Sequence, residues 1–463
     1  MEMNSSCSMK RVPLLVAIAI GLYFMNPTEA RRTIIDITHT YYNVIPAFGS
    51  PNGSKPIIHE QDRDGFQTGY YTVGTHYGTH VDTPQHLMSL IDNPISVPTL
   101  DLLTLIGPVL VVRIPTGVQN ITAQVVCNLG LPTGLERVIF KTDNTDRCLM
   151  NQIPFEKNYA GLMPDAAEWL VKNTTIKFIG VDYMSVASFN YAVEVHEILL
   201  NKPGVIPVEC LNLEGVEPGY YDVYCLPTKV ETEGAPARCI LMKPTKAKRT
   251  ILDITHTLKN YMTVWKNYAQ TKEIIREHNG THFRTGEFTV GTDYGTHVDS
   301  PQHLLSLKDS PISALTLDLQ TLIGRVLVVR IPTGVRNITA QVVSNLGLPR
   351  GIKRVIFKTD NTDRRLMNKI AFETDYTGLT PDAADLLVKN TTIKFIGVDY
   401  MSVASFDYHH QVHEILLNKP GVIPVECLNL KGVEPGYYDV YCLPIKVAME
   451  AATARCILMN TRH

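Results

Sequence analysis

Two short segments of the sequence gather side chains that could do chemistry. In the first, three imidazoles and a carboxylate fall within eleven residues: His76, His80, Asp82 and His86. Imidazole nitrogens and carboxylate oxygens are ligands of zinc and neighbouring divalent metals, and such a metal can make hydroxide at neutral pH. This density of ligands predicts a metal site.

The second segment repeats the first with one change. Asp293 stands where the first segment has His76, and His297, Asp299 and His303 follow at the same spacing. Glycine and proline in both segments argue against a continuous helix, so we expect a loop that enters a strand. Residues two apart on a strand face the same side, which directs each His-x-Asp pair at a common partner.

Two later residues are expected to complete the first site. Glu209 lies in an apolar run, where a carboxylate needs a cationic partner. A metal is the preferred partner, and a buried arginine is the alternative. His196 lies on an expected helix and, taken alone, is better explained as a hydrogen-bonded helix histidine.

Alternating strands and helices must position these residues. β-branched apolar runs predict strands at 109–114, 138–142, 176–181 and 205–209, and hairpin-like strands near 221–226 and 237–242. Helices are predicted at 163–171 and 193–200, with a short one from residue 123. Asp36 and His39 are expected to fix the end of a first strand by hydrogen bonds. The pattern predicts the α/β class.

The chain contains the same domain twice. A shift of 217 residues carries 32–39 onto 249–256, 180–189 onto 397–406, and 205–213 onto 422–430. So long a period indicates duplicated domains and no solenoid of short repeats. We therefore expect copy one at 31–243, a short polar linker at 244–248, and copy two at 249–463.

The N-terminus and the composition indicate where the protein acts and which partners it does not bind. Two basic residues, an apolar run at 12–24 and small residues to Ala30 predict a secretory signal at 1–30, with a signal anchor as the alternative. Asn-x-Ser/Thr triplets in the rest of the chain are consistent with that route; they begin at Asn52, Asn120, Asn173, Asn279, Asn337 and Asn390. A net charge of −2 argues against nucleic acid, and no charge run suggests a membrane surface. We expect a secreted protein of the extracellular matrix or cell wall.

Cysteine positions favour an oxidising compartment only in part. Cys127 and Cys148 have Ser344 and Arg365 as counterparts in copy two, so we predict a bridge between them. Three further cysteines recur in both copies, at 210, 225 and 239 and at 427, 442 and 456. A link between residues 225 and 239 with Cys210 free is one option, and buried thiols throughout are the other.

The metal motif resembles that of a known family. The pattern His-x-Gly-Thr-His-x-Asp-x-Pro-x-His, with a later His and Glu thirteen residues apart, resembles the cyclase family of metal-dependent hydrolases, which includes bacterial-type kynurenine formamidases. The resemblance covers nearly the whole mature chain, once per copy, and is closest to the plant cyclase-like branch. It implies two tandem cyclase-family domains of the swivelling β/β/α type.

The resemblance also implies residue roles. In copy one it makes metal ligands of His76, His80, Asp82, His196 and Glu209, with Asp82 bridging where two metals are bound and His86 as the acid–base residue. In copy two the matching ligands are Asp293, His297, Asp299, His413 and Glu426, with His303 as the acid–base residue. The cofactor expected is Zn²⁺ or Mn²⁺, one or two ions per competent site.

Asp293 departs from the family pattern. Aspartate is a harder and shorter ligand than histidine, so it favours Mn²⁺ or Mg²⁺ over Zn²⁺. We therefore expect copy one to be the catalytic half, and copy two to be weakened, altered in metal choice, or structural.

The expected activity is hydrolysis of a small aromatic N-formyl amide, such as N-formylkynurenine to kynurenine and formate. The alternative is a non-catalytic matrix or stress-response protein that binds and retains the fold. Because the resemblance implies dimeric relatives, the two copies are expected to form a pseudo-dimer within one chain.

Overall fold

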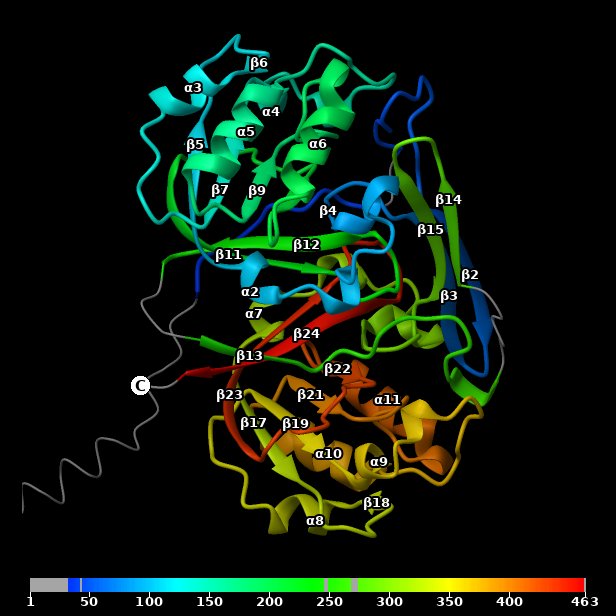
Figure 1. Cartoon of the computed structure of the whole chain (residues 1–463). Helices are drawn as coiled ribbons and strands as arrows, with labels where there is room; N and C mark the ends of the chain where they lie inside the picture. Colours follow the sequence, from blue (N-terminus) through cyan, green and yellow to red (C-terminus); the bar gives the residue numbers. More distant parts are fainter. Residues whose placement is uncertain (1–31, 42–43, 245–248, 268–273, 462–463) are drawn as a thin grey trace, which may run out of the picture. The chain divides into compact units, whose positions relative to one another are not determined.

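The structure is a computed model, which describes residues 32–41, 44–244, 249–267 and 274–461 (Figure 1). The predicted signal at 1–30 lies outside the described residues, as does most of the predicted linker. Within the described ranges, none of the helices combines the length and the apolar character that a bilayer crossing requires.

Copy one is built on one mixed sheet. Its strand order is β1-β12-β11-β5-β7-β9-β10-β4, and β4 also pairs with β12. That second pairing closes seven of the strands into a barrel-like ring and leaves β1 outside on β12. The strands of this sheet are β1 Ile34–Asp36, β4 His80–Asp82, β5 Ile106–Arg113, β7 Arg137–Lys141, β9 Phe178–Val181, β10 Ile206–Glu209, β11 Gly219–Pro227 and β12 Gly234–Met242.

Helices pack against the parallel part of this sheet. Strands β5, β7, β9 and β10 are parallel neighbours, and helices lie in the connections between them, as βαβ units require. The helices are α2 Leu102–Leu105, α3 Ala123–Asn128, α4 Asp143–Asp146, α5 Pro164–Asn173 and α6 Ala192–Leu200, and the small strands β6 Asn120–Ile121 and β8 Gly161–Leu162 pair beside them.

Copy two repeats this architecture. Its sheet runs β13-β24-β16-β22-β21-β19-β17-β23, and the pairing of β24 with β23 closes the equivalent ring. The strands are β13 Arg249–Asp253, β16 His297–Asp299, β17 Ile323–Arg330, β18 Asn337–Ile338, β19 Arg354–Lys358, β20 Gly378–Leu379, β21 Phe395–Val398, β22 Ile423–Glu426, β23 Gly436–Pro444 and β24 Ala451–Thr461; the helices are α7 Leu319–Leu322, α8 Ala340–Asn345, α9 Asp360–Asp363, α10 Pro381–Asn390 and α11 His409–Leu417. The predicted α/β class and the duplication are confirmed.

Local signals explain where the principal helices begin. Pro164 occupies the first turn of α5, where its missing N–H costs nothing. The hydroxyl of Thr122 accepts a hydrogen bond from the backbone N–H of Val125 and caps α3. Apolar residues of α5 and α6, including Leu170 and Val195, are buried against Phe140 of β7 in one cluster.

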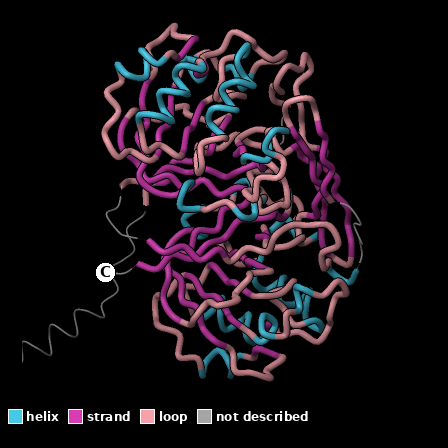
Figure 2. Tube along the Cα trace, viewed as in Figure 1, coloured by secondary structure: helices cyan, strands magenta, loops and turns pink. Residues whose placement is uncertain are grey.

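A second sheet joins the two copies. Each copy contributes a hairpin: β2 Ile57–Arg63 with β3 Phe66–Gly74, and β14 Ile275–Asn279 with β15 Arg284–Gly291. The order is β14-β15-β3-β2, so β3 of copy one pairs antiparallel with β15 of copy two. The four strands lie side by side in Figure 1, and Figure 2 colours this region as strand. The predicted pseudo-dimer is therefore present within one chain.

Equivalent residues meet at this interface. The hydroxyls of Thr72 and Thr289 are 2.7 Å apart, and those of Tyr224 and Tyr441 are 2.9 Å apart with their rings stacked. Each pair is related by the shift of 217 residues, and a residue that contacts its own counterpart marks a local two-fold axis. The interface is thus isologous, as in a symmetric dimer.

Ion pairs also cross between the copies. Nζ of Lys446 lies 2.9 Å from Oδ2 of Asp36, and Nζ of Lys229 lies 2.8 Å from Oδ2 of Asp253. Asp36 also accepts a hydrogen bond from the backbone N–H of Thr38, which fits its expected role at the end of the first strand. Its contact with the other copy could not be expected from the local sequence.

The predicted bridge between Cys127 and Cys148 is wrong, because both thiols are free and exposed. Cys127 is on α3, which packs against α5, whereas Cys148 follows α4 in a left-handed conformation with its sulfur 3.9 Å from the Asp146 carbonyl oxygen. Their joint absence from copy two therefore records no lost disulfide.

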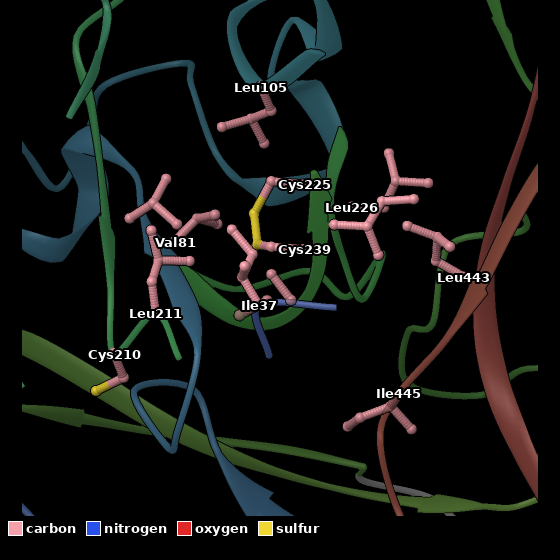
Figure 3. Packing of buried hydrophobic residues seen from close by; sticks show 14 of the residues in the cluster. Ile37, Val81, Leu105, Cys210, Leu211, Cys225, Leu226, Cys239, Leu443 and Ile445 are labelled. Carbon is pink, nitrogen blue, oxygen red and sulfur yellow. A yellow bond between two sulfur atoms is a disulfide. The ribbon is translucent and has the colours of Figure 1, made fainter. Parts of the chain in front are cut away.

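The disulfides instead join paired strands. Cys225 of β11 lies opposite Cys239 of β12 and is bonded to it, while Cys210 is buried and free (Figure 3). Cys442 and Cys456 form the equivalent bond in copy two. This is one of the two arrangements left open by the sequence.

Candidate metal centres

Strand register brings the first ligands of copy one together. The short strand β4 carries His80 and Asp82 and lies between β10 and β12. In this register Glu209 of β10 is directly opposite His80. Side chains at directly opposed positions approach within a few ångströms, so residues far apart in sequence meet at one point.

Helix α6 supplies the next ligand. Nε2 of His196 lies 3.3 Å from Oε1 of Glu209 and 3.5 Å from Oδ2 of Asp82. Nε2 of His80 lies 3.4 Å from the other oxygen of Glu209. The structure thus places His80, Asp82, His196 and Glu209 around a common centre.

Backbone carbonyls fix the tautomers of these imidazoles. Nδ1 of His80 lies 2.7 Å from the carbonyl oxygen of Gly78, and Nδ1 of His196 lies 2.6 Å from that of Ala192. A carbonyl only accepts, so each Nδ1 carries the hydrogen and donates it. Each Nε2 therefore presents its lone pair to the centre, as a metal ligand must.

The donor set fits a cation. Nε2 of His80 and both carboxylate oxygens of Asp82 are buried without a hydrogen-bond partner in the part of the chain that the structure describes. Buried polar atoms without partners are rare and costly in folded proteins. A divalent metal bound by these atoms would satisfy all three.

The loop residue His76 joins this centre with a partner that the sequence did not reveal. Nδ1 of His76 lies 2.9 Å from Asp82, and its Nε2 donates to the buried carboxylate of Glu233 at 3.2 Å. Burial lowers the pKa of His76, but Asp82 and Glu233 outweigh burial and raise that pKa to about 10. These carboxylates therefore favour positive charge at this point.

Glu233 was missed because it lies 157 residues from His76. One signal could have found it: the shift of 217 residues carries Glu233 onto Glu450, so both copies keep an acid just before a buried strand. Thr75 donates its hydroxyl hydrogen to Glu233 at 2.6 Å and holds the carboxylate in place.

His86 faces the same centre from the 3-10 helix η1, Pro84–His86. Its Nδ1 donates to the carbonyl oxygen of Arg284 at 2.7 Å, so Nε2 is free to accept a proton. Burial and the neighbouring His76 lower the pKa of His86 well below its ordinary value. Arg284 belongs to copy two, so one copy orients the candidate base of the other.

Copy two has the same frame with a different donor set. Donor atoms of Asp299, His303 and His413 converge, and those of His297, Asp299 and Glu426 form an overlapping group. Both oxygens of Asp299 are buried without a hydrogen-bond partner in the described ranges. Nδ1 of His303 donates to the carbonyl oxygen of Gln67 from copy one at 2.9 Å.

Asp293 does not enter either group of converging donors that the described residues form. Its half-buried side chain lines a cavity beside the copy-two centre, where desolvation raises the pKa of Asp293. A second difference accompanies it. Gly234 of copy one corresponds to Ala451 of copy two, and a Cβ at Gly234 would lie 2.9 Å from Cε1 of His76. The histidine in this position therefore requires the glycine.

A cavity of about 290 Å³ opens onto the copy-one centre. Its lining is mostly apolar and includes Phe48 and Met184 of copy one and Phe283 of copy two. Phe283 stacks on His86 with the ring centroids 4.8 Å apart. A small molecule with an apolar body could therefore lie against the candidate base.

A known protein family matches the chain twice. The model of the Cyclase family matches residues 35–188 and 252–405. The chain belongs to the Cyclase family, in two tandem copies. Cyclase-like protein 1 of Arabidopsis thaliana is 42% identical over 243 residues, which is 50% of this chain and 95% of that protein.

More distant proteins also match. A kynurenine formamidase of Salinibacter ruber is 28% identical over 187 residues, covering 39% of this chain and 82% of that protein. Among solved structures, isatin hydrolase A of Ralstonia solanacearum is 21% identical and covers 51% of this chain and 100% of its own, with a TM-score of 0.41.

Proposed function

We propose that copy one is a metal-dependent hydrolase centre that cleaves a small aromatic N-formyl amide, such as N-formylkynurenine to kynurenine and formate. The observation that carries this proposal is the convergence of buried, unpartnered donor atoms beside His86, whose Nδ1 donates to a carbonyl so that Nε2 can accept a proton. Membership of the Cyclase family and the similarity to a kynurenine formamidase support the same kind of chemistry.

His76, His80, Asp82, His196 and Glu209 would hold the metal. A divalent cation supplies Lewis acidity, which lowers the pKa of a water and polarises a carbonyl. His86 accepts the water's proton as the oxygen bonds to the formyl carbon. The carbon–nitrogen bond then breaks, and His86 returns that proton to the departing aromatic amine.

The donor set limits the choice of metal. Three imidazoles and two carboxylates in copy one suit Zn²⁺ or Mn²⁺, and Asp82 would contribute to both ions where two are bound. Copy two presents two imidazoles in these positions, so it favours a harder ion such as Mn²⁺ or Mg²⁺. We propose one or two ions in copy one.

Metal content and turnover test the proposal together. We expect the purified chain to contain Zn²⁺ or Mn²⁺ and to hydrolyse N-formylkynurenine. His80→Ala should remove copy-one metal and activity, whereas His86→Gln should keep the metal and lose on the order of 10²- to 10⁴-fold in kcat. His59→Gln, which changes an exposed histidine on β2, is the matched control.

Two results would contradict this function. Metal-loaded protein that cleaves no formanilide would exclude the substrate class. A chain that binds no divalent metal would favour the alternative, a protein of the extracellular matrix that acts by binding alone.

We further propose that the protein is secreted and glycosylated. All six sequon asparagines are exposed, and two disulfides are present, as in proteins of oxidising compartments. A glycan can therefore be attached at each sequon without disturbing the core. Expression in a secreting cell, followed by enzymatic removal of N-glycans, should lower the mass of the protein in the medium; an intracellular, unmodified chain would overturn this proposal.

A further inference from the structure

Of three pairs of equivalent residues around the two cavities, two pairs differ between the copies and one is the same. The shift of 217 residues pairs Phe48 with Trp265 and Ala192 with His409. It also pairs Phe66 with Phe283, each of which lines the cavity of the other copy. Each cavity thus has one aromatic wall from each copy, and copy two carries a histidine ring at the position where copy one has the methyl group of Ala192.

The histidine at this position of copy two is His409. Its centroid lies 4.2 Å from Trp265 in a stacked arrangement and 4.6 Å from Phe66. Its Nδ1 lies 3.1 Å from the hydroxyl of Ser402. A planar ring therefore lies against both aromatic walls of copy two and makes one polar contact at its edge.

In copy one the corresponding space is open. Ala192 begins α6 four residues before His196, so its methyl lies on the same helix face as that ligand. Alanine carries no atoms beyond Cβ, so residue 192 leaves open the space that the ring of His409 takes between the two walls in copy two.

The linings of the two cavities show the effect of this difference. The copy-one cavity is lined by Ala192, Ser185 and His196. The copy-two cavity, about 300 Å³, is lined by His409 but by neither Ser402 nor His413, the counterparts of Ser185 and His196. The ring of His409 covers them, since it lies 4.5 Å from the ring of His413.

The cavity of copy two therefore extends away from the space that Ala192 leaves open in copy one. It extends along β2 and β3, where Gln61, Arg63 and Tyr70 form its lining. The two cavities have similar volumes but do not offer the same space next to the metal ligands.

We propose that Phe48, Ala192 and Phe283 form an aryl slot, which holds the planar ring of the substrate in copy one, and that His409 permanently fills the equivalent slot in copy two. The inference rests on the proposed function for the statement that this ring belongs to a substrate. The ring centroid of Phe283 lies 4.8 Å from that of His86 and 5.4 Å from that of His196. A ring bound in the slot therefore places its substituent at the candidate base and the metal ligands. Copy two is closed to the same ring.

Exchange of the two residues tests the slot. The probe is 2-aminoacetophenone, a planar aromatic amine without a hydrolysable bond, titrated calorimetrically into the metal-loaded full chain. The wild type should bind about one molecule per chain. Ala192→His should abolish this binding, and His409→Ala should add a second molecule, which quenches the fluorescence of Trp265.

Matched variants separate the slot from general damage. Glu194→His places the same imidazole at an exposed position of α6 and should leave probe binding unchanged. Ala192→Ser adds one atom and should retain it. Wild type that does not bind the probe, or an Ala192→His variant that binds it as well as the wild type, would overturn the slot.

The outcomes distinguish the slot from the proposed function. If Ala192→His abolishes probe binding while the wild type cleaves no formanilide, the slot stands and the hydrolase proposal fails. If the wild type cleaves N-formylkynurenine and Ala192→His leaves both KM and probe binding unchanged, the hydrolase stands and the slot fails.

Discussion

At the scale of single residues, copy one and copy two differ in a coupled pair. His76 of copy one passes close to Gly234, and both are replaced in copy two, by Asp293 and Ala451. A shorter side chain at the first position leaves space for a methyl group at the second. Restoring the histidine alone therefore cannot rebuild the site.

We predict that Asp293→His fails to raise the Zn²⁺ affinity of copy two, whereas Asp293→His combined with Ala451→Gly raises it. The reciprocal change Gly234→Ala should lower the Zn²⁺ affinity of copy one by about 10- to 100-fold, because it displaces a ligand. Competition with a chromophoric chelator measures each affinity. An equal gain from the single and double variants would show that the two positions are independent.

Glu233 positions His76, one of the candidate metal ligands. Its carboxylate accepts the Nε2 hydrogen, which leaves Nδ1 for the centre. We predict that Glu233→Gln lowers metal affinity by about 10- to 100-fold, since partners of this kind orient the ligand and raise its basicity. Glu450→Gln is the control, because no histidine stands at residue 293. A Glu233→Gln chain with wild-type metal affinity would exclude this role.

At the scale of elements, the hairpins exchanged between copies build each site. Strand β15 of copy two gives the carbonyl that orients His86, and the adjacent Phe283 packs on its ring. β3 of copy one gives the same support to His303 through Gln67 and Phe66. Each centre therefore depends on a strand from the other half of the chain.

We predict that Phe283→Ala lowers copy-one kcat by at least about tenfold with metal content unchanged, because small misplacements of a catalytic group are costly. Phe66→Ala changes the counterpart next to copy two and should leave copy-one turnover much closer to wild type. Metal analysis with single-turnover kinetics measures both effects. An equal loss in the two variants would mean that the substitutions act through stability alone.

At the scale of the whole molecule, ion pairs between the copies link stability to pH. Burial raises the pKa of Asp36, but Arg238 and Lys446 outweigh burial and lower this pKa below the ordinary value of 3.8. In the same way, Arg455 and Lys229 lower the pKa of Asp253. A depressed carboxyl pKa stabilises the fold fully above the unfolded value, and this stability is lost as the pH falls through the folded value.

We predict that the free energy of unfolding falls steeply below about pH 3.8 and that Asp36→Asn with Asp253→Asn flattens this dependence. At neutral pH each substitution should cost on the order of 3 kcal/mol, because it leaves a buried cation without its partner. Urea unfolding across a pH series measures both effects. An unchanged slope in the double variant would place the acid sensitivity elsewhere.

The amino-acid sequence by itself predicts the class, the duplication and the short segments in which most candidate donors lie. The histidines and aspartate of each motif lie within eleven residues, and strand alternation alone directs His80 and Asp82 to one side. Helix α6 and strand β10 also follow from local patterns, so the apolar periodicity of the chain already assigns His196 and Glu209 to their elements.

Which distant residues meet depends on the tertiary structure. Glu233 reaches His76 across 157 residues, and Arg284 reaches His86 across 198. Strand register decides between the two arrangements that the sequence left open for Cys225 and Cys239, and the predicted bridge between Cys127 and Cys148 does not form. His409 is an ordinary helix residue until Trp265 and Phe66 lie against it. Local periodicity specifies the face of an element, whereas pairing between elements depends on the packing of the whole chain, which no short segment of sequence encodes.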